Sequence, residues 1–184
     1  MKINRYELHL DINDLEHSYE GSERIYLEAE EEKLLLNAVD LNIKKVRVNG
    51  KDSDFSVNRA NEEVSVETNL KGETIVDLEF SGNIGQTLTG FYLAKAEDSE
   101  MFTTQFESSG ARRTFPCLDH PAYKAQFSLS LTIREHLDAV SNMPIKSDRS
   151  SDGKRILTFE DTPRMSTYLL FPNKCLLCCP SLPN

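Results

Sequence analysis

The feature that most constrains the fold of this chain is an alternation of apolar and polar side chains. It is longest over residues 123–133, where Tyr, Ala, Phe, Leu, Leu and Ile occupy every second position and Lys, Gln, Ser and Thr lie between them. A period of two directs consecutive side chains to opposite faces of a β-strand, whereas a helical face needs a period of about 3.6. Residues 123–133 are therefore predicted to form a strand with one buried and one solvated face.

Shorter alternations of the same kind recur along the chain, at residues 6–12, 25–29, 46–48, 55–57, 64–66, 76–80 and 157–159. Asn49-Gly50 lies between the stretches 46–48 and 55–57, and this pair is typical of a two-residue hairpin turn. Residues 55–57 are therefore predicted to be the return strand of the hairpin. Residues 28–36 are rich in helix formers, but the stretch is short and flanked by strands, so no helix is expected there. One helical turn is predicted over residues 111–115, capped by Ser108 or Ser109.

This spacing of strands and turns predicts an all-β protein, a β-sandwich-like stack of mostly antiparallel sheets with at most a short helical turn near residues 110–116. Residues 1–170 are assigned to this β domain. Residues 171–184 differ, because they lack the alternation and contain three of the seven prolines and three of the four cysteines. They are predicted to be an atypical tail outside the sheets.

The cysteines of the tail, Cys175, Cys178 and Cys179, form a CxxCC cluster that supplies only part of a zinc site. A tetrahedral structural site needs four ligands, and the sequence has no second CxxC and no suitable histidine pair. We expect free thiols there and assign the cluster no role. The histidines, at positions 9, 17, 120 and 136, include no two that are four residues apart, so the HExxH arrangement of a zinc peptidase is absent.

The charge of the chain narrows the choice of partners. The formal net charge is −9, and a surface of that sign repels the phosphates of nucleic acids and anionic lipids. It attracts cations, and the amino terminus of a peptide is one. No apolar run approaches the roughly 18 residues of a membrane span, and the first residues show no signal-peptide pattern, so a cytoplasmic location is expected.

Catalytic motifs are missing from the sequence as well. It contains neither a G-x-S-x-G nucleophile elbow nor a glycine-rich phosphate loop. We therefore predict no catalytic residue, no metal ligand and no cofactor in this chain.

The segment most capable of binding chemistry is residues 101–107. Read as a strand, it directs Phe102, Thr104 and Phe106 to one face, and its polar side chains to the other, namely Thr103, Gln105 and Glu107. A carboxylate two residues from an amide can receive an ammonium group and hydrogen-bond a neighbouring peptide group. Spacing alone favours the alternative, a polar face that is simply solvated.

Several long motifs, in order and correctly spaced, carry a resemblance to a known family: LTGFY at residues 88–92, TTQFES at 103–108, ARRTFPCLDHPAYKA at 111–125, NMP at 142–144 and PRMSTYLL at 163–170. Together they closely resemble the N-terminal domain of the gluzincin zinc aminopeptidases, the group of aminopeptidase N, the puromycin-sensitive enzyme and the tricorn-interacting factors of archaea. The resemblance covers about residues 1–170.

The resemblance implies a saddle-like stack of β-sheets whose strand over residues 101–107 reaches the active-site cleft. By the same resemblance, Glu107 matches the residue that binds the free α-amino group of a peptide substrate, and Gln105 matches one that lines the first side-chain pocket. Arg112, Arg113 and Asp119 are expected to hold the following turn together, as an Arg–carboxylate pair commonly does.

Two departures from the family pattern stand out. His120 follows Asp119 where the family usually has Glu, and the resemblance ends near residue 170. Family members continue into a zinc-binding catalytic domain with a G-x-M-E-N loop and HExxH, and these motifs are absent. We expect a chain cut short before that domain, able to recognise peptide N-termini weakly but inactive alone. The alternative left open is a stand-alone β-sandwich with a binding or structural role and no link to peptidases.

Overall fold

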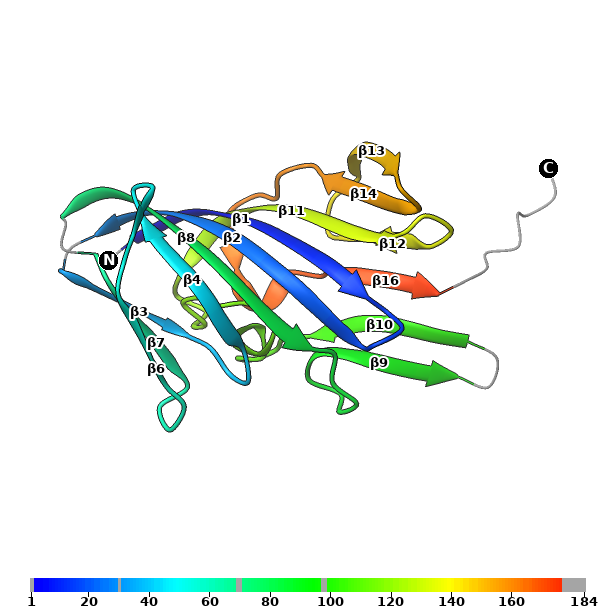
Figure 1. Ribbon diagram of the computed structural model, residues 1–184, viewed down its shortest axis with the longest axis horizontal. Coiled ribbons are helices and arrows are strands. Elements are labelled where there is room, and N and C mark those ends of the chain that lie inside the picture. The colour runs from blue at the N-terminus through cyan, green and yellow to red at the C-terminus, as the bar shows by residue number, and fades with distance from the viewer. Residues whose placement is uncertain (1, 30, 69–70, 97–98, 177–184) are drawn as a thin grey trace.

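The computed structural model describes residues 2–29, 31–68, 71–96 and 99–176. They form three β-sheets and two single helical turns (Figure 1). The all-β, mostly antiparallel, sandwich-like architecture expected from the alternation is thereby confirmed. Among the described residues there is no helix of the length and hydropathy needed to cross a bilayer.

The largest sheet has nine strands and is built around a central strand, β1 (Lys2–Asn13). This strand pairs antiparallel with β2 (Ser18–Ala29) and parallel with β11 (Lys124–Arg134). The sheet continues from β2 through β8, β4 and β5 (Gly72–Asn83, Asn42–Val48 and Lys51–Asp52), and from β11 through β14 and β13 (Lys154–Phe159 and Ile145–Ser151). A short strand, β15 (Met165–Ser166), also pairs with β11.

The two smaller sheets lie near opposite ends of the large one (Figure 1). One has three strands in the order β3, β7, β6 (Lys33–Asn37, Glu63–Glu67 and Phe55–Asn58). The other has four in the order β12, β16, β10, β9 (Asp138–Val140, Asn173–Leu176, Ser99–Gln105 and Gly90–Ala96). The inner face of the large sheet and the small sheets share one hydrophobic core.

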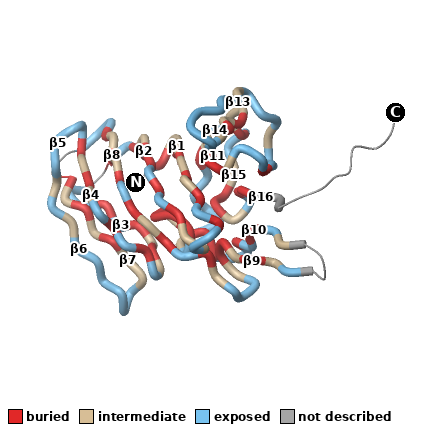
Figure 2. The backbone as a smooth tube through the Cα atoms, turned by 45° about the vertical axis from the view of Figure 1, so that its right-hand side comes forward, coloured by how far each residue is buried: buried red, intermediate tan, exposed pale blue. Residues whose placement is uncertain are grey.

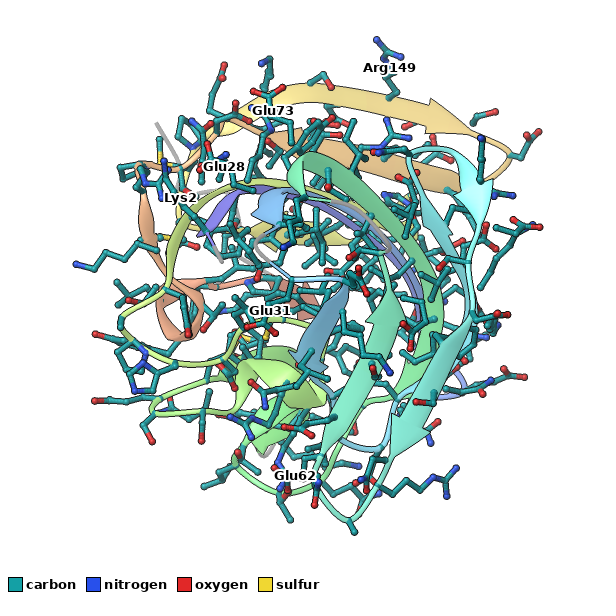
Figure 3. The ribbon with its side chains drawn as sticks, turned by 90° about the vertical axis from the view of Figure 1, so that its left-hand side faces the viewer. Lys2, Glu28, Glu31, Glu62, Glu73 and Arg149 are labelled. Carbon is teal, nitrogen blue, oxygen red and sulfur yellow. The ribbon has the colours of Figure 1, made fainter. Side chains whose placement is uncertain are left out.

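The register of the large sheet places side chains in rows across its inner face. One such row is Phe127, Tyr6, Ile25, Val76 and Val48, all of them buried. Buried positions recur along β1, β2 and β8 in the same way (Figure 2). At one end of the sheet the outward row is Lys2, Glu28 and Glu73 (Figure 3). The alternation predicted for residues 123–133 is confirmed with two exceptions: Tyr123 lies before β11 and is exposed, and Thr132, on the face predicted to be solvated, is buried.

The hairpin at Asn49-Gly50 is confirmed, because both residues have a positive φ and β4 pairs with β5. The return strand is not the predicted one. Residues 55–57 belong to β6, which pairs with β7 in the three-stranded sheet. The chain leaves the large sheet after Asp52, where Ser53 Oγ donates to the carbonyl of Glu67 on β7 at 2.6 Å.

Two helical turns interrupt the strands, η1 (Ala111–Arg113) and η2 (Thr167–Leu169). The first lies within the predicted residues 111–115, whereas the second was not predicted. The residue before η1 is Gly110, which makes no side-chain cap, so the expected capping by Ser108 or Ser109 is wrong. Both serines instead lie exposed in the preceding turn. The described residues within 28–36 form no helix, as expected; β2 ends at Ala29 and β3 begins at Lys33.

The tail does not stay outside the sheets. Residues 173–176 form β16, which lies between β10 and β12 and pairs antiparallel with both. The tail was predicted to lie outside the sheets because its sequence shows no alternation. A strand of four residues that pairs with a neighbouring strand on each side is too short to show a clear periodic pattern. Cys178 and Cys179 lie outside the described residues, and of Cys175 only the backbone is described.

Candidate substrate-binding site

The candidate site lies where β10 ends. Gln105 is the last residue of this strand, and Glu107 is in the turn that follows it, so the strand is shorter than the predicted one. Both side chains are exposed, and Phe106 between them is buried at 2 % exposure. Within the described residues, the side chains of Gln105 and Glu107 form no hydrogen bond or ion pair. The amide and the carboxylate are therefore available to a ligand.

Aromatic packing fixes the strand and turn from below. Phe102 lies within 6.4 Å of Phe91, measured between ring centroids, and is fully buried. Phe106 meets Phe115 edge to face at 6.2 Å. These contacts confirm the predicted apolar face of the segment. Because the rings cannot move without opening the core, they hold the backbone that carries Gln105 and Glu107.

The polar face of residues 101–107, which was predicted to be solvated, is exposed only in part. Thr103 was predicted to share a solvated face with Gln105 and Glu107, yet it is buried at 6 % exposure. The reason is β16, whose Asn173 lies over it. Asn173 Oδ1 accepts a hydrogen bond from Thr103 Oγ1 at 2.8 Å and another from the backbone N–H of Thr104 at 3.2 Å.

Gly110 shapes the turn that presents Glu107. Its N–H donates to the carbonyl of Phe106 at 2.7 Å and closes the turn. A Cβ at this position would stand 2.8 Å from the carbonyl oxygen of Gln105, so no other residue fits without shifting the backbone. The peptide bond between Glu107 and Ser108 is cis.

A second glycine lies beside Gln105. Gly90 is the residue paired with Gln105 across β9 and β10, and its φ is +69°. A Cβ at Gly90 would lie 2.8 Å from Cβ of Arg113. The glycine therefore makes room for the side chain of Arg113 next to the strand that carries Gln105. The sequence analysis assigned no role to either glycine. Gly90 lies within the motif at residues 88–92, and Gly110 lies between the motifs at residues 103–108 and 111–125.

The connection after the turn is held by a buried ion pair, as expected of Arg112 and Asp119. Asp119 Oδ2 accepts from Arg112 Nε at 3.1 Å and from the Arg112 N–H at 3.2 Å, and Oδ1 accepts from Thr167 Oγ1 at 2.8 Å. Arg113 does not join this pair; it is 4.0 Å from Asp40 on the surface. His120 is exposed, and its Nδ1 accepts from the N–H of Ala122 at 3.2 Å.

The histidines are scattered, so they build no metal centre. His9 lies on β1 between the hydroxyls of Ser130 and Thr132, at 3.3 and 3.2 Å, and burial lowers its pKa. His17 stands 5.7 Å from the ring of Phe102. Within the ranges that the structure describes, no three His, Cys, Asp or Glu side chains are grouped as a metal ion requires. The described residues thus do not fit zinc.

A hollow of about 530 Å³ lies elsewhere, on the outer face of the large sheet. Four of its charged groups are already paired with each other: Arg5 with Asp161 at 2.8 Å, and Arg24 with Asp77 at 2.6 Å. Such pairs neutralise each other's charge and leave little attraction for a charged ligand. The exposed and unpaired Gln105 and Glu107 are therefore the better candidate site.

Comparison with known proteins agrees with the motifs. Residues 2–169 match the peptidase M1 N-terminal domain. The chain is 47 % identical over 169 residues to the tricorn protease-interacting factor F2 of Thermoplasma volcanium, covering 92 % of this chain and 21 % of that protein. It is 40 % identical over 169 residues to the factor of the same name from Thermoplasma acidophilum, with the same coverage of 92 % and 21 %.

A bacterial relative gives the same result. Aminopeptidase N of Lactococcus lactis is 40 % identical over 172 residues, covering 90 % of this chain and 20 % of that protein. The chain thus spans about a fifth of the length of the relatives it matches. On these matches, together with the all-β fold, the chain belongs to the peptidase M1 N-terminal domain family.

Proposed function

We propose that this chain is the substrate-recognition domain of a zinc aminopeptidase, holding the free amino end of a peptide through Glu107 and Gln105. The observation that carries the proposal is the pair itself: an exposed carboxylate and an exposed amide, both unpaired, on a backbone fixed by buried Phe102 and Phe106. Glu107 attracts the ammonium group, and Gln105 offers a donor and an acceptor to the first peptide unit.

The names of the relatives support a role in aminopeptidase action, because several are called aminopeptidases. In such an enzyme, zinc and a general-base Glu activate the water that attacks the peptide bond. We assign that chemistry to a catalytic domain other than this one, and to this chain only the recognition of the amino end. Its location is proposed to be cytoplasmic.

The isolated chain is expected to bind weakly. The α-amino group of a peptide, with a pKa of about 7.7–8.0, is mostly charged at neutral pH. One exposed ion pair contributes about 0–1 kcal/mol, whereas even a millimolar complex needs about 4 kcal/mol. The remaining free energy must come from the walls of a complete cleft.

Two ligands, one with and one without a free amino group, test the proposal. Leucine amide, titrated into the isotope-labelled chain, should shift the NMR signals of Gln105 and Glu107 with a dissociation constant in the millimolar range or weaker. N-acetyl-leucine amide, which lacks the ammonium group, should not. Glu107→Gln should abolish the shifts, whereas Glu135→Gln, at an exposed position elsewhere, should leave them unchanged. Equal shifts from both ligands would refute amine recognition.

An intact relative offers a test by turnover. Replacing its residue equivalent to Glu107 by Ala should sharply reduce the release of N-terminal amino acids while the protein stays folded. An unchanged turnover rate would remove Glu107 from the site.

A further inference from the structure

Glu23 is a buried carboxylic acid whose side chain forms no hydrogen bond within the described residues. It is 3 % exposed, and both of its carboxyl oxygens are buried without a hydrogen-bond partner among the described residues. On β2 it shares the inner face with Ile25, and its neighbours across the strands are Leu8 on β1 and Leu78 on β8. Buried polar groups in native proteins are nearly always paired, so an unpaired carboxyl calls for an explanation.

Among the residues that the structure describes, no cation pairs with this carboxyl. The groups that act on it electrostatically are the phenol of Tyr6 on β1 and the thiol of Cys117, and both of these also interact with Asp119. Arg112 already binds Asp119 and Glu62. The other side chains in the row of paired residues that contains Glu23 are apolar, namely Leu129 on β11, Leu8 on β1, Leu78 on β8 and Val46 on β4.

The same place is where residues 115–119 attach to the sheets. The N–H of Leu118 donates to the hydroxyl of Tyr6 at 3.1 Å. Cys117 exchanges two backbone hydrogen bonds with Asn37 on β3, of 2.8 and 3.0 Å. A charge appearing on Glu23 would therefore lie beside the contacts that dock this segment.

We propose that Glu23 makes the attachment of residues 115–119 to the sheets sensitive to pH. With its proton, the side chain is a neutral acid that the apolar core tolerates. Without it, an unpaired carboxylate is buried, and the core must open to let water reach it. The proposal is independent of the role of Gln105 and Glu107.

The direction of the effect follows from burial. Burial raises the pKa of Glu23 well above its ordinary value. Between the ordinary and the raised value, the folded chain holds a proton that the unfolded chain has lost. Stability therefore falls as the pH rises through this range and is fully present only below it. Burial also raises the pKa of Cys117 and of Tyr6, which keeps both neutral there.

Urea unfolding of the whole chain between pH 5 and pH 8 tests this. Relative to Glu23→Gln, a neutral mimic of the acid, the wild-type unfolding constant should rise by up to about tenfold per pH unit within the range. Glu28→Gln, on the exposed face of the same strand, should keep the wild-type dependence. Identical pH profiles for wild type and Glu23→Gln would overturn the proposal.

Two measurements complete the test. Carbon NMR titration of the Glu23 carboxyl in the wild-type chain needs no variant, and a pKa near the ordinary value would refute the proposal even if Glu23→Gln failed to fold. Hydrogen exchange then locates the opening. At pH 8 the amides of Cys117 and Leu118 should exchange faster in wild type than in Glu23→Gln, and equally fast at pH 5. Equal rates at both pH values would overturn the local opening.

Discussion

Two buried acids of this chain are held in opposite ways. Asp119 has a side chain with no exposed surface, and it accepts hydrogen bonds from Arg112 and Thr167. Glu23 is buried nearly as deeply and accepts none. A buried carboxylate is tolerated when charge-assisted hydrogen bonds replace its water, and otherwise it keeps its proton. Asp119 is therefore held by its partners, whereas burial raises the pKa of Glu23.

Removing the Asp119 carboxylate should destabilise the chain strongly. Asp119→Ala removes the buried partner of the Arg112 guanidinium, whose side chain is only 19 % exposed, and leaves it the half-exposed Glu62 alone. We expect a loss of about 3 kcal/mol in the free energy of unfolding, measured by urea titration. Asp148→Ala removes the same kind of partner from Arg155, and should cost far less because the Asp148 side chain is 39 % exposed and water screens that pair. Similar losses for the two variants would contradict this assignment.

At the scale of elements, close backbone approach decides where glycine is needed. Gly21 on β2 lies beneath the ring of Phe80 on β8, and a Cβ there would stand 2.4 Å from the ring. Gly50, in the hairpin turn, has a φ of +79° and open space around it. A side chain is excluded at Gly21 by packing between strands, and it is disfavoured at Gly50 by the backbone conformation.

Alanine at the two positions should separate these causes. Gly21→Ala overpacks the sheet and should cost about 1–3 kcal/mol, while Gly50→Ala forces a left-handed alanine and should cost about 1–2 kcal/mol. The discriminating measurement is a double-mutant cycle with Phe80→Leu in urea unfolding. The smaller side chain should relieve Gly21→Ala and be additive with Gly50→Ala. Additivity at both positions would exclude the ring contact as the cause.

For the whole molecule, the long-range pairing of β1 with β11 matters most, since it joins residues 5–11 to 126–132 in one sheet. The sheets leave Gln105 and Glu107 exposed at one end of β10, and among the described residues no three His, Cys, Asp or Glu side chains are grouped as a metal ion requires.

We therefore expect no peptidase activity from this chain alone. Purified chain supplied with zinc should release no fluorophore from an aminoacyl-coumarin above the blank, because no described group can hold the metal. A full-length aminopeptidase relative in the same assay is the positive control. Zinc-dependent release that a chelator abolishes would contradict this expectation.

Much of this architecture could be predicted, because strand faces and turns depend on neighbouring residues. The alternation over 125–133 identified the buried face of β11, and Asn49-Gly50 identified the hairpin turn. Motif resemblance singled out Gln105 and Glu107, and the exposure of both side chains is compatible with that assignment. The burial of Glu23 was not predicted, although this residue shares the parity of Ile25 on β2.

The sequence by itself thus determined which face of each long strand is buried and where the chain turns. Only the tertiary structure decided that residues 55–57 join another sheet, that β16 covers Thr103, and that no cation meets Glu23. The physical reason is that alternation specifies a face, whereas solvation of a polar side chain depends on distant segments that pack against it.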